Sequence, residues 1–224
     1  MAEPTSPASA AFWDGRYRSG GDRWELGAAA PVLADFLADH PWAPEPPGTV
    51  LVPGCGRGHE ARLLAERGFD VVGLDFSSEA LAEARRIPFL ARGRLAWVQA
   101  DLFDRPALTA AGLLPGSLAG VVEHTCFCAI DPGQRQAYIN TVVDLLAPGG
   151  WLLALFWCHA QPGGPPFGAD PGELEQRLRA AGLTAELWQP APLAAQLVQR
   201  PPRQDEWLGF WRKNKPLEGL DSLA

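Results

Sequence analysis

Short apolar runs and segments of helical periodicity alternate along most of the chain. The apolar runs are shorter than most helices, which is typical of buried strands. Such strands are predicted over residues 50–52, 70–74, 96–101, 118–123, 151–157, 183–188 and 206–212. Helices are predicted between them over residues 31–40, 59–67, 78–86, 133–146 and 171–181. This alternation predicts an α/β fold with a doubly wound sheet.

A glycine-rich turn joins the first predicted strand to the next helix. It contains Gly54, Gly56 and Gly58, positions where a side chain would keep a ligand away from the backbone. Asp75 ends the following strand, at the sheet edge where doubly wound folds bind ligands and where a carboxylate can accept both hydroxyls of a ribose. Together these features predict a site for an adenosine-containing cofactor, although the glycines alone would also suit a tight strand-to-helix connection.

The glycine spacing narrows the choice of cofactor. The chain has G-x-G-x-G, whereas a dinucleotide fingerprint is G-x-G-x-x-G and leaves a helix N-terminus free for the pyrophosphate. The turn also lacks the Gly-Lys-Ser/Thr sequence of a phosphate-binding loop. The spacing therefore favours S-adenosylmethionine over NAD or a nucleoside triphosphate.

Four segments share their sequences with a known enzyme family. They are Phe12-Trp-Asp-Gly-Arg-Tyr17 with Arg23-Trp-Glu-Leu-Gly27, Leu51-Val-Pro-Gly-Cys-Gly56, Thr125-Cys-Phe-Cys-Ala-Ile130 with Asp131, Pro132 and Arg135, and Gly163-Gly-Pro-Pro-Phe167. On these segments the chain resembles class I S-adenosylmethionine-dependent methyltransferases of the thiopurine S-methyltransferase family, including its halide and thiol methyltransferase branch. The match runs from residue 12 to about residue 213.

The resemblance implies a domain organisation. It predicts one methyltransferase domain over residues 11–224, preceded by residues 1–10, whose small and polar composition predicts a disordered tail. Within that domain, an N-terminal lid and helix (11–48) would precede a Rossmann-like core (49–213) whose seven-stranded sheet is mostly parallel with an antiparallel last strand. The proline-rich stretch 41–48 reads as a stiff linker.

The resemblance also implies which residues hold the cofactor. Trp13, Tyr17 and Trp24 would close over it, since aromatic faces attract a sulfonium cation and exclude water. In a chain with nine tryptophans, each of these aromatics is also a candidate core residue. The list of expected contacts adds Gly54, Gly56, Asp75 with its neighbour Phe76, Asp101 facing the adenine amine, Leu102 against the ring, and His124. Asp101 alone would be read as a cap of the following turn.

The acceptor is expected at the end of the fourth strand. The halide and thiol branch commonly has tyrosine where this chain has His124, and aspartate where it has Glu123. His124 then has three readings: a base for a thiol, a group stacked near the cofactor, or a histidine without chemistry. Arg135 matches a family arginine near the acceptor, where its charge would favour a thiolate, or it is a solvated helix residue. Phe127, Phe167 and Trp157 would complete a dry apolar pocket.

Composition limits the classes of partner. The chain of 224 residues carries a net charge of −7 and no basic stripe, which disfavours nucleic acid. It contains no apolar stretch of membrane-spanning length and no secretory leader, so a cytoplasmic monomer acting on a small molecule is expected. The four cysteines form no C-x-x-C pair, and no metal site is expected. An O- or N-methyltransferase of another small metabolite, and a binding module without catalysis, remain alternatives.

Overall fold

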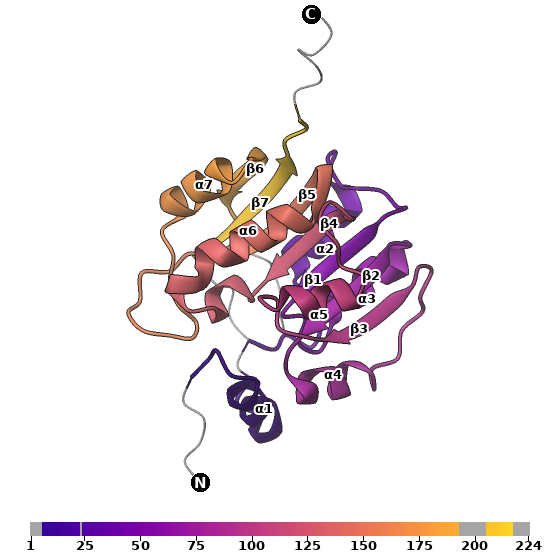
Figure 1. Cartoon of the computed structure of the whole chain (residues 1–224), viewed down its shortest axis with the longest axis vertical. Helices are drawn as coiled ribbons and strands as arrows, with labels where there is room; N and C mark the ends of the chain where they lie inside the picture. The colour runs from indigo at the N-terminus through magenta and orange to yellow at the C-terminus, as the bar shows by residue number, and fades with distance from the viewer. Residues whose placement is uncertain (1–5, 23, 193–204, 217–224) are drawn as a thin grey trace, which may run out of the picture.

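A computed structural model describes residues 6–22, 24–192 and 205–216. Within them a single seven-stranded sheet has the order β3-β2-β1-β4-β5-β7-β6 (Figure 1). The strands are β1 (Thr49–Pro53), β2 (Asp70–Asp75), β3 (Leu95–Gln99), β4 (Leu118–His124), β5 (Leu146–Trp157), β6 (Leu183–Pro190) and β7 (Glu206–Lys213). Strand β7 runs antiparallel to β5 and β6, and the other pairs are parallel. The doubly wound, Rossmann-like sheet with an antiparallel last strand is confirmed.

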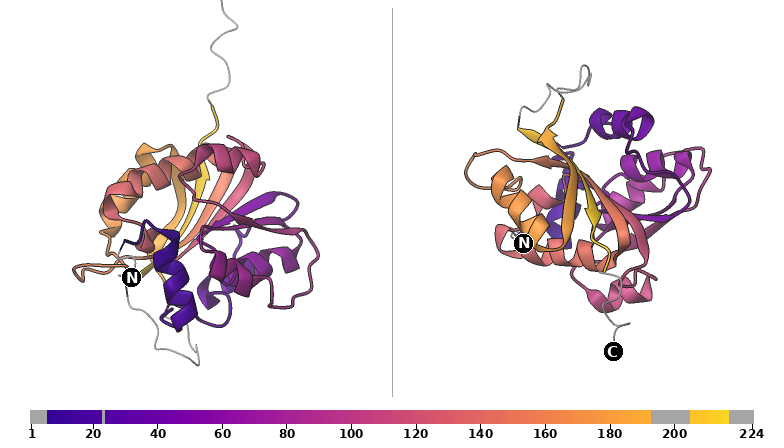
Figure 2. Two further views of the ribbon diagram at one scale, coloured as in Figure 1. Left: turned by 60° about the horizontal axis from the view of Figure 1, so that its bottom comes forward. Right: turned by 90° about the horizontal axis from the view of Figure 1, so that it is seen from above.

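Helices cover both faces of the sheet (Figure 2). One face carries α2 (Pro31–Asp39), α3 (His59–Arg67) and α4 (Ser78–Ala84), whose buried side chains join one core cluster. The other face carries α5 (Arg105–Ala110), α6 (Arg135–Leu145) and α7 (Pro171–Ala180), which join a second cluster. None of the helices in the described part of the chain is long and apolar enough to cross a bilayer.

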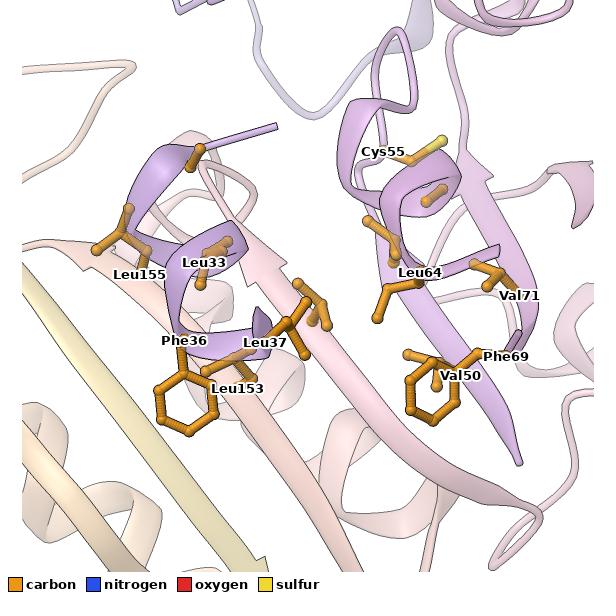
Figure 3. Close-up of a cluster of buried hydrophobic side chains, with 14 of the residues drawn as sticks. Leu33, Phe36, Leu37, Val50, Cys55, Leu64, Phe69, Val71, Leu153 and Leu155 are labelled. Atoms are coloured by element: carbon orange, nitrogen blue, oxygen red, sulfur yellow. The ribbon is translucent and has the colours of Figure 1, made fainter. Parts of the chain in front are cut away.

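Strand β1 shows how the sequence builds the two cores. Val50 and Val52 belong to the cluster under α2 and α3, while Leu51 belongs to the cluster under α6. Side chains of a strand alternate between faces, so an unbroken apolar run buries both sides of a central strand. Figure 3 shows Leu33 and Phe36 of α2 and Leu64 of α3 packed over this layer.

Helix α1 (Ala10–Ser19) belongs to neither helical layer; it lies at the sheet edge where the parallel strands end and contacts the start of α4 (Figure 2). The Ser9 side chain caps its first turn, and Gly20 ends it in a left-handed conformation. The expected disordered tail ran to residue 10, but Ser9 and Ala10 already belong to this helix start; residues 1–5 lie outside the described residues. We call residues 10–22 and 24–27 the N-terminal cover.

The structure differs from the predicted elements at α5, β3 and α6, and β5 begins at Leu146 rather than at residue 151. Helix α5 was not predicted; the Asp104 side chain caps it and Pro106 stands in its first turn. Strand β3 ends at Gln99 rather than at Asp101, because the Asp101 side chain turns the chain by accepting from the Phe103 N–H. Helix α6 begins at Arg135, after a short 3₁₀ turn over Pro132–Gln134.

Candidate active site

The β1–α3 turn is a cradle that only glycine can form. Gly54 and Gly56 have φ angles of 56° and 53°, in the left-handed region. A Cβ on Gly54 would lie 2.8 Å from the Cys126 sulfur, and one on Gly56 would lie 2.7 Å from the Tyr17 hydroxyl. The turn therefore lies in close contact with the loop after β4 and with the N-terminal cover.

Asp75 is fixed beside this cradle by backbone donors. Its Oδ2 accepts from the Gly56 N–H and its Oδ1 from the Ser77 N–H, both at 2.9 Å. The residue is only 7% exposed, and burial raises the pKa of its carboxyl to about 6 despite these hydrogen bonds. A carboxylate has about four lone-pair positions, so Asp75 retains acceptors for a ligand's hydroxyl groups.

A cavity of about 770 Å³ opens above the carboxyl ends of the strands. It is lined by the predicted cofactor residues except Gly56 and His124, namely Trp13, Tyr17, Trp24, Gly54, Asp75, Phe76, Asp101 and Leu102. Gly56 lies directly beneath, bonded to Asp75. The volume is within the range of small-molecule sites.

The aromatic residues of the N-terminal cover form one cluster over this cavity. The Trp24 ring lies 5.4 Å from Trp13 and 5.8 Å from Tyr17, edge to face in both cases. The Trp13 indole N–H donates to the Pro7 carbonyl at 2.8 Å. Burial raises the pKa of Tyr17 above its ordinary value, so its hydroxyl stays neutral and the cavity roof is uncharged at this point.

Charged groups attach the N-terminal cover to the cradle. Arg57, in the glycine turn, pairs with Asp22, with Glu25 at 2.9 Å and with Glu83 of α4. Glu25 also meets His59 Nε2 at 2.7 Å. Burial acts to raise the pKa of Glu25, but the His59 and Arg57 hydrogen bonds outweigh it and lower the value to about 2. Glu25 is therefore ionised throughout the physiological range.

The cover is attached a second time through α1. Asp14 accepts from the Ser77 hydroxyl at 2.6 Å and from the Glu79 N–H at 3.2 Å, at the start of α4. In sequence, Asp14 directly follows Trp13, and Asp22 and Glu25 enclose Trp24, so the two attachments hold the aromatic cluster against the cavity.

The loop after β4 forms the opposite wall and is held in a strained conformation. Thr125 has a φ of 65°, which is rare for a β-branched residue. Below it, the buried Glu123 carboxylate accepts from the Phe127 N–H at 2.8 Å and from the Tyr138 hydroxyl. Burial raises the pKa of Glu123, although both hydrogen bonds oppose the rise. Strain of this kind persists only where surrounding contacts fix it, and Glu123 and Tyr138 provide those contacts.

Arg135 does not line the cavity, contrary to its predicted catalytic role. Its guanidinium donates to the Gly168 carbonyl at 2.7 Å and to the Phe167 carbonyl at 2.9 Å, and it lies 4.6 Å from the centre of the Phe127 ring. Arg135 thus anchors the loop after β5 to α6. The sequence did not reveal this role, because the two carbonyls come from a distant loop.

Replacing Arg135 with methionine should therefore loosen the loop rather than change the acceptor's ionisation. The loss of hydrogen bonds to a charged group should cost about 2 kcal/mol of unfolding free energy. We expect KM for the acceptor to rise by the same factor at every pH between 6 and 9. Thermal unfolding measures the loss of stability, and turnover at several acceptor concentrations and pH values measures KM. A defect confined to neutral pH and cured at high pH would instead place Arg135 beside the acceptor.

His124 also lies away from the cavity wall. Its Nδ1 meets Glu60 Oε1 of α3 at 2.8 Å, and Glu60 also accepts from the Ala30 N–H at 3.0 Å. Successive side chains of β4 point to opposite faces of the sheet, so His124 faces α3 because its neighbour Glu123 faces α6. Of the three hypotheses for His124, the structure favours a histidine with no catalytic role. Its contact with Glu60 links β4 to α3 and to the start of α2.

The side of the cavity where the sequence predicts the acceptor is formed by two loops. Trp157 lines it as predicted, whereas Phe127 is buried in the core and Phe167 lines a second pocket beside the loop after β5. Ile130, Gln161, Pro165 and Pro166 line the cavity too, from the two loops that the sequence placed beside the acceptor. The sequence reasoning did not single out three further lining residues, Arg16, Asp131 and Gln134. Arg16 was detectable, because it stands three residues after Trp13 and beside Tyr17 on one helix face.

Thiols contribute to the wall without forming a metal site. Cys126 and Cys128 line the cavity, and burial raises the pKa of Cys126 well above its ordinary value. Over the described ranges, no group of three or more His, Cys, Asp and Glu side chains is arranged to hold a metal ion.

Comparison with known sequences identifies the family. The family model for Thiopurine S-methyltransferase (TPMT) matches residues 8–190. Probable thiol methyltransferase 2 of Arabidopsis thaliana is 30% identical over 220 residues, covering 93% of this chain and 88% of the relative. Thiocyanate methyltransferase 1 of the same plant is 30% identical over 202 residues, 85% and 79% of the two chains.

Solved structures agree on the fold. The 1,6-didemethyltoxoflavin-N1-methyltransferase of Burkholderia thailandensis, with bound 1,6-didemethyltoxoflavin and S-adenosylhomocysteine, superposes with a TM-score of 0.69. It is 20% identical, and the match covers 96% of this chain and 93% of that chain. The glycine cradle, the fixed Asp75 and the cavity above them suit the same cofactor. The chain belongs to the thiopurine S-methyltransferase family and is an S-adenosylmethionine-dependent methyltransferase.

Proposed function

We propose that the enzyme methylates a small soft nucleophile, namely a thiol, hydrosulfide, halide or thiopurine. The observation that supports this most is the character of the acceptor wall. Trp157, Ile130, Pro165 and Pro166 make it largely apolar, and no histidine or lysine belongs to the described lining. Hydroxyl and ammonium acceptors have to lose a proton to a base, whereas a thiolate or halide is already anionic and has no proton to lose. The names of the plant relatives point the same way.

Within this proposal, the cradle and its neighbours hold the cofactor. Asp75 would accept the ribose hydroxyls, and Asp101 with Leu102 and Phe76 would surround the adenine. When bound, the cofactor supplies a methyl group whose bond to sulfur breaks as the acceptor's electron pair attacks, leaving a neutral thioether. Trp13, Tyr17 and Trp24 exclude water from that region, and Thr125 to Ile130 orient the acceptor. Orientation of this kind is worth roughly 7–11 kcal/mol of barrier in favourable cases.

We further propose that the protein is a cytoplasmic monomer that works without nucleic acid, with one domain over residues 11–224. The net charge of −7 disfavours nucleic acid, and the cavity is of a size for small molecules.

Three acceptors that have the same benzene ring but different attacking atoms test the substrate class. Thiophenol, phenol and aniline differ in the attacking atom, so their turnover with S-adenosylmethionine compares sulfur, oxygen and nitrogen directly. We expect methylation of thiophenol, and at least roughly 100-fold slower reaction of the other two, because neither ionises or attacks as readily without a base. Preferred methylation of phenol or aniline would support the alternative, an O- or N-methyltransferase.

The N-terminal cover should behave as a lid. Arg57→Gln removes the pairs with Asp22, Glu25 and Glu83, so amides of residues 12–22 and 24–27 should exchange hydrogen faster than in the wild type. S-adenosylhomocysteine should slow that exchange in the wild type.

Arg18→Gln is the matched control for the lid. Arg18 lies on α1 within the cover, but its side chain is 62% exposed and its Nε is 3.8 Å from the Glu79 carboxylate. The lid proposal would be contradicted if these amides exchange at the same rate in Arg57→Gln, Arg18→Gln and the wild type. Their exchange in the wild type would also have to be the same with and without S-adenosylhomocysteine.

A further inference from the structure

The cavity has an unbalanced charge. Asp75, Asp101 and Asp131 line it, and Arg16 is the one cationic side chain of the described lining. An anion that enters this space meets three carboxylates, which at close range disfavour its binding by Coulomb repulsion. If the acceptor is anionic, as the proposed function implies, a nearby cation has to compensate for them.

Arg16 has its hydrogen-bond donors available. Its guanidinium lies over the Phe12 ring, 4.6 Å from the centroid, and within the described ranges it forms no ion pair and donates no hydrogen bond. The other arginines near the site are engaged: Arg57 by three carboxylates and Arg135 by two carbonyls. Five N–H donors in a planar, weakly hydrated group suit a large polarisable anion.

The position of Arg16 on α1 directs it toward the acceptor half. At 3.6 residues per turn, Asp14 and Arg16 stand about 200° apart around the helix. Asp14 fixes its flank of the helix onto the start of α4, which follows β2. In the sheet order, β2 and the β4–β5 pair lie on opposite sides of β1. The flank that carries Arg16 is therefore the one turned away from the β2 side.

We propose that Arg16 binds the anionic acceptor and makes the enzyme selective for negatively charged nucleophiles. This inference rests on the proposed function, because it assumes that a soft anion is the methyl acceptor. It also assigns a second task to α1, whose Trp13 and Tyr17 roof the cofactor side while Arg16 serves the acceptor side. The carboxylate end of the cofactor is the competing anion, and the test separates the two.

Iodide is the probe, since it is an anion at every pH. In Arg16→Gln, KM for iodide should rise roughly 10- to 100-fold, the effect of losing hydrogen bonds to a charged group. The turnover number at saturation should change little, and the calorimetric Kd of S-adenosylhomocysteine should stay within about twofold because that ligand is held elsewhere. Arg16→Lys should recover part of the loss, and Arg18→Gln should match the wild type.

Two results would overturn the proposal. Unchanged iodide KM in Arg16→Gln would show that Arg16 does not hold the acceptor. If Arg16→Gln binds S-adenosylhomocysteine more weakly but binds methylthioadenosine, which lacks the amino-acid end, with unchanged affinity, Arg16 would be assigned to the cofactor carboxylate.

Should the wild type turn over neither iodide nor any thiol, the proposed function would be wrong. Arg16 would then be judged by calorimetric iodide binding to the S-adenosylhomocysteine complex: loss in Arg16→Gln would support the anion site, and equal binding would reject it.

Discussion

Replacing Asp75 with alanine should weaken S-adenosylmethionine and S-adenosylhomocysteine binding by roughly 1.5–3 kcal/mol, the range for hydrogen bonds to a charged group. Both Asp75 oxygens are already oriented by the Gly56 and Ser77 N–H groups, so the carboxylate needs no rearrangement to accept ribose hydroxyls. Calorimetry with both ligands measures the effect. Equal affinity for wild type and Asp75→Ala would remove Asp75 from the cofactor site.

The raised pKa of Asp75 adds a pH dependence with a definite sign. The folded protein without ligand releases this proton at about pH 6, whereas the ordinary value is 3.8. Stability from the neutral carboxyl is thus complete below about pH 4 and is lost as the pH rises to about 6. Accepting two hydroxyls favours the ionised form, so cofactor affinity should increase between pH 5 and 7. In Asp75→Asn this increase should disappear, whereas its persistence would assign the titration to another group.

Glu123→Ala should be the most destabilising single change in the acceptor wall. It leaves the Phe127 N–H and the Tyr138 hydroxyl buried without an acceptor, and each such loss costs about 1–3 kcal/mol. A total of roughly 2–6 kcal/mol is expected, measured by denaturant unfolding, together with a lower turnover number because Thr125 is no longer held.

Glu123→Gln is the matched control. Its amide oxygen can still accept from Phe127, and its NH₂ group can donate to the Tyr138 oxygen, so most stability should remain. If Glu123→Ala and Glu123→Gln unfold at the same denaturant concentration as the wild type, Glu123 does not brace the loop.

The sequence predicted those elements whose ends are set by local chemistry. The bounds of α3 were predicted as found, because Gly58 before it and Gly68 after it both adopt left-handed conformations, with φ angles of 73° and 106°. The cradle and Asp75 were also accessible, since their spacing alone brings them to one edge of the sheet. Helix α5 was missed because it spans only six residues and has little periodicity to detect.

Side-chain direction explains what the sequence did not reveal about the site. Arg135 and His124 were placed at the right end of the sheet, but their orientations depend on the Phe167 and Gly168 carbonyls and on Glu60. Those partners are 32 or more residues away, and no local pattern links them. Arg16 was the reverse case. Its helical spacing from Trp13 was visible in the sequence, whereas only the structure shows that its guanidinium contacts the Phe12 ring and forms no ion pair with another described residue.

A crystal structure with S-adenosylhomocysteine and thiophenol tests the central claim most directly. The ribose hydroxyls should lie within hydrogen-bonding distance of Asp75, the adenine beside Leu102 and Asp101, and the cofactor sulfur toward the Thr125–Ile130 loop. The thiophenol sulfur should approach that sulfur from the Trp157 side, with room for one methyl group between them. A ribose turned away from Asp75, or an acceptor bound outside the cavity, would contradict both the site and the proposed reaction.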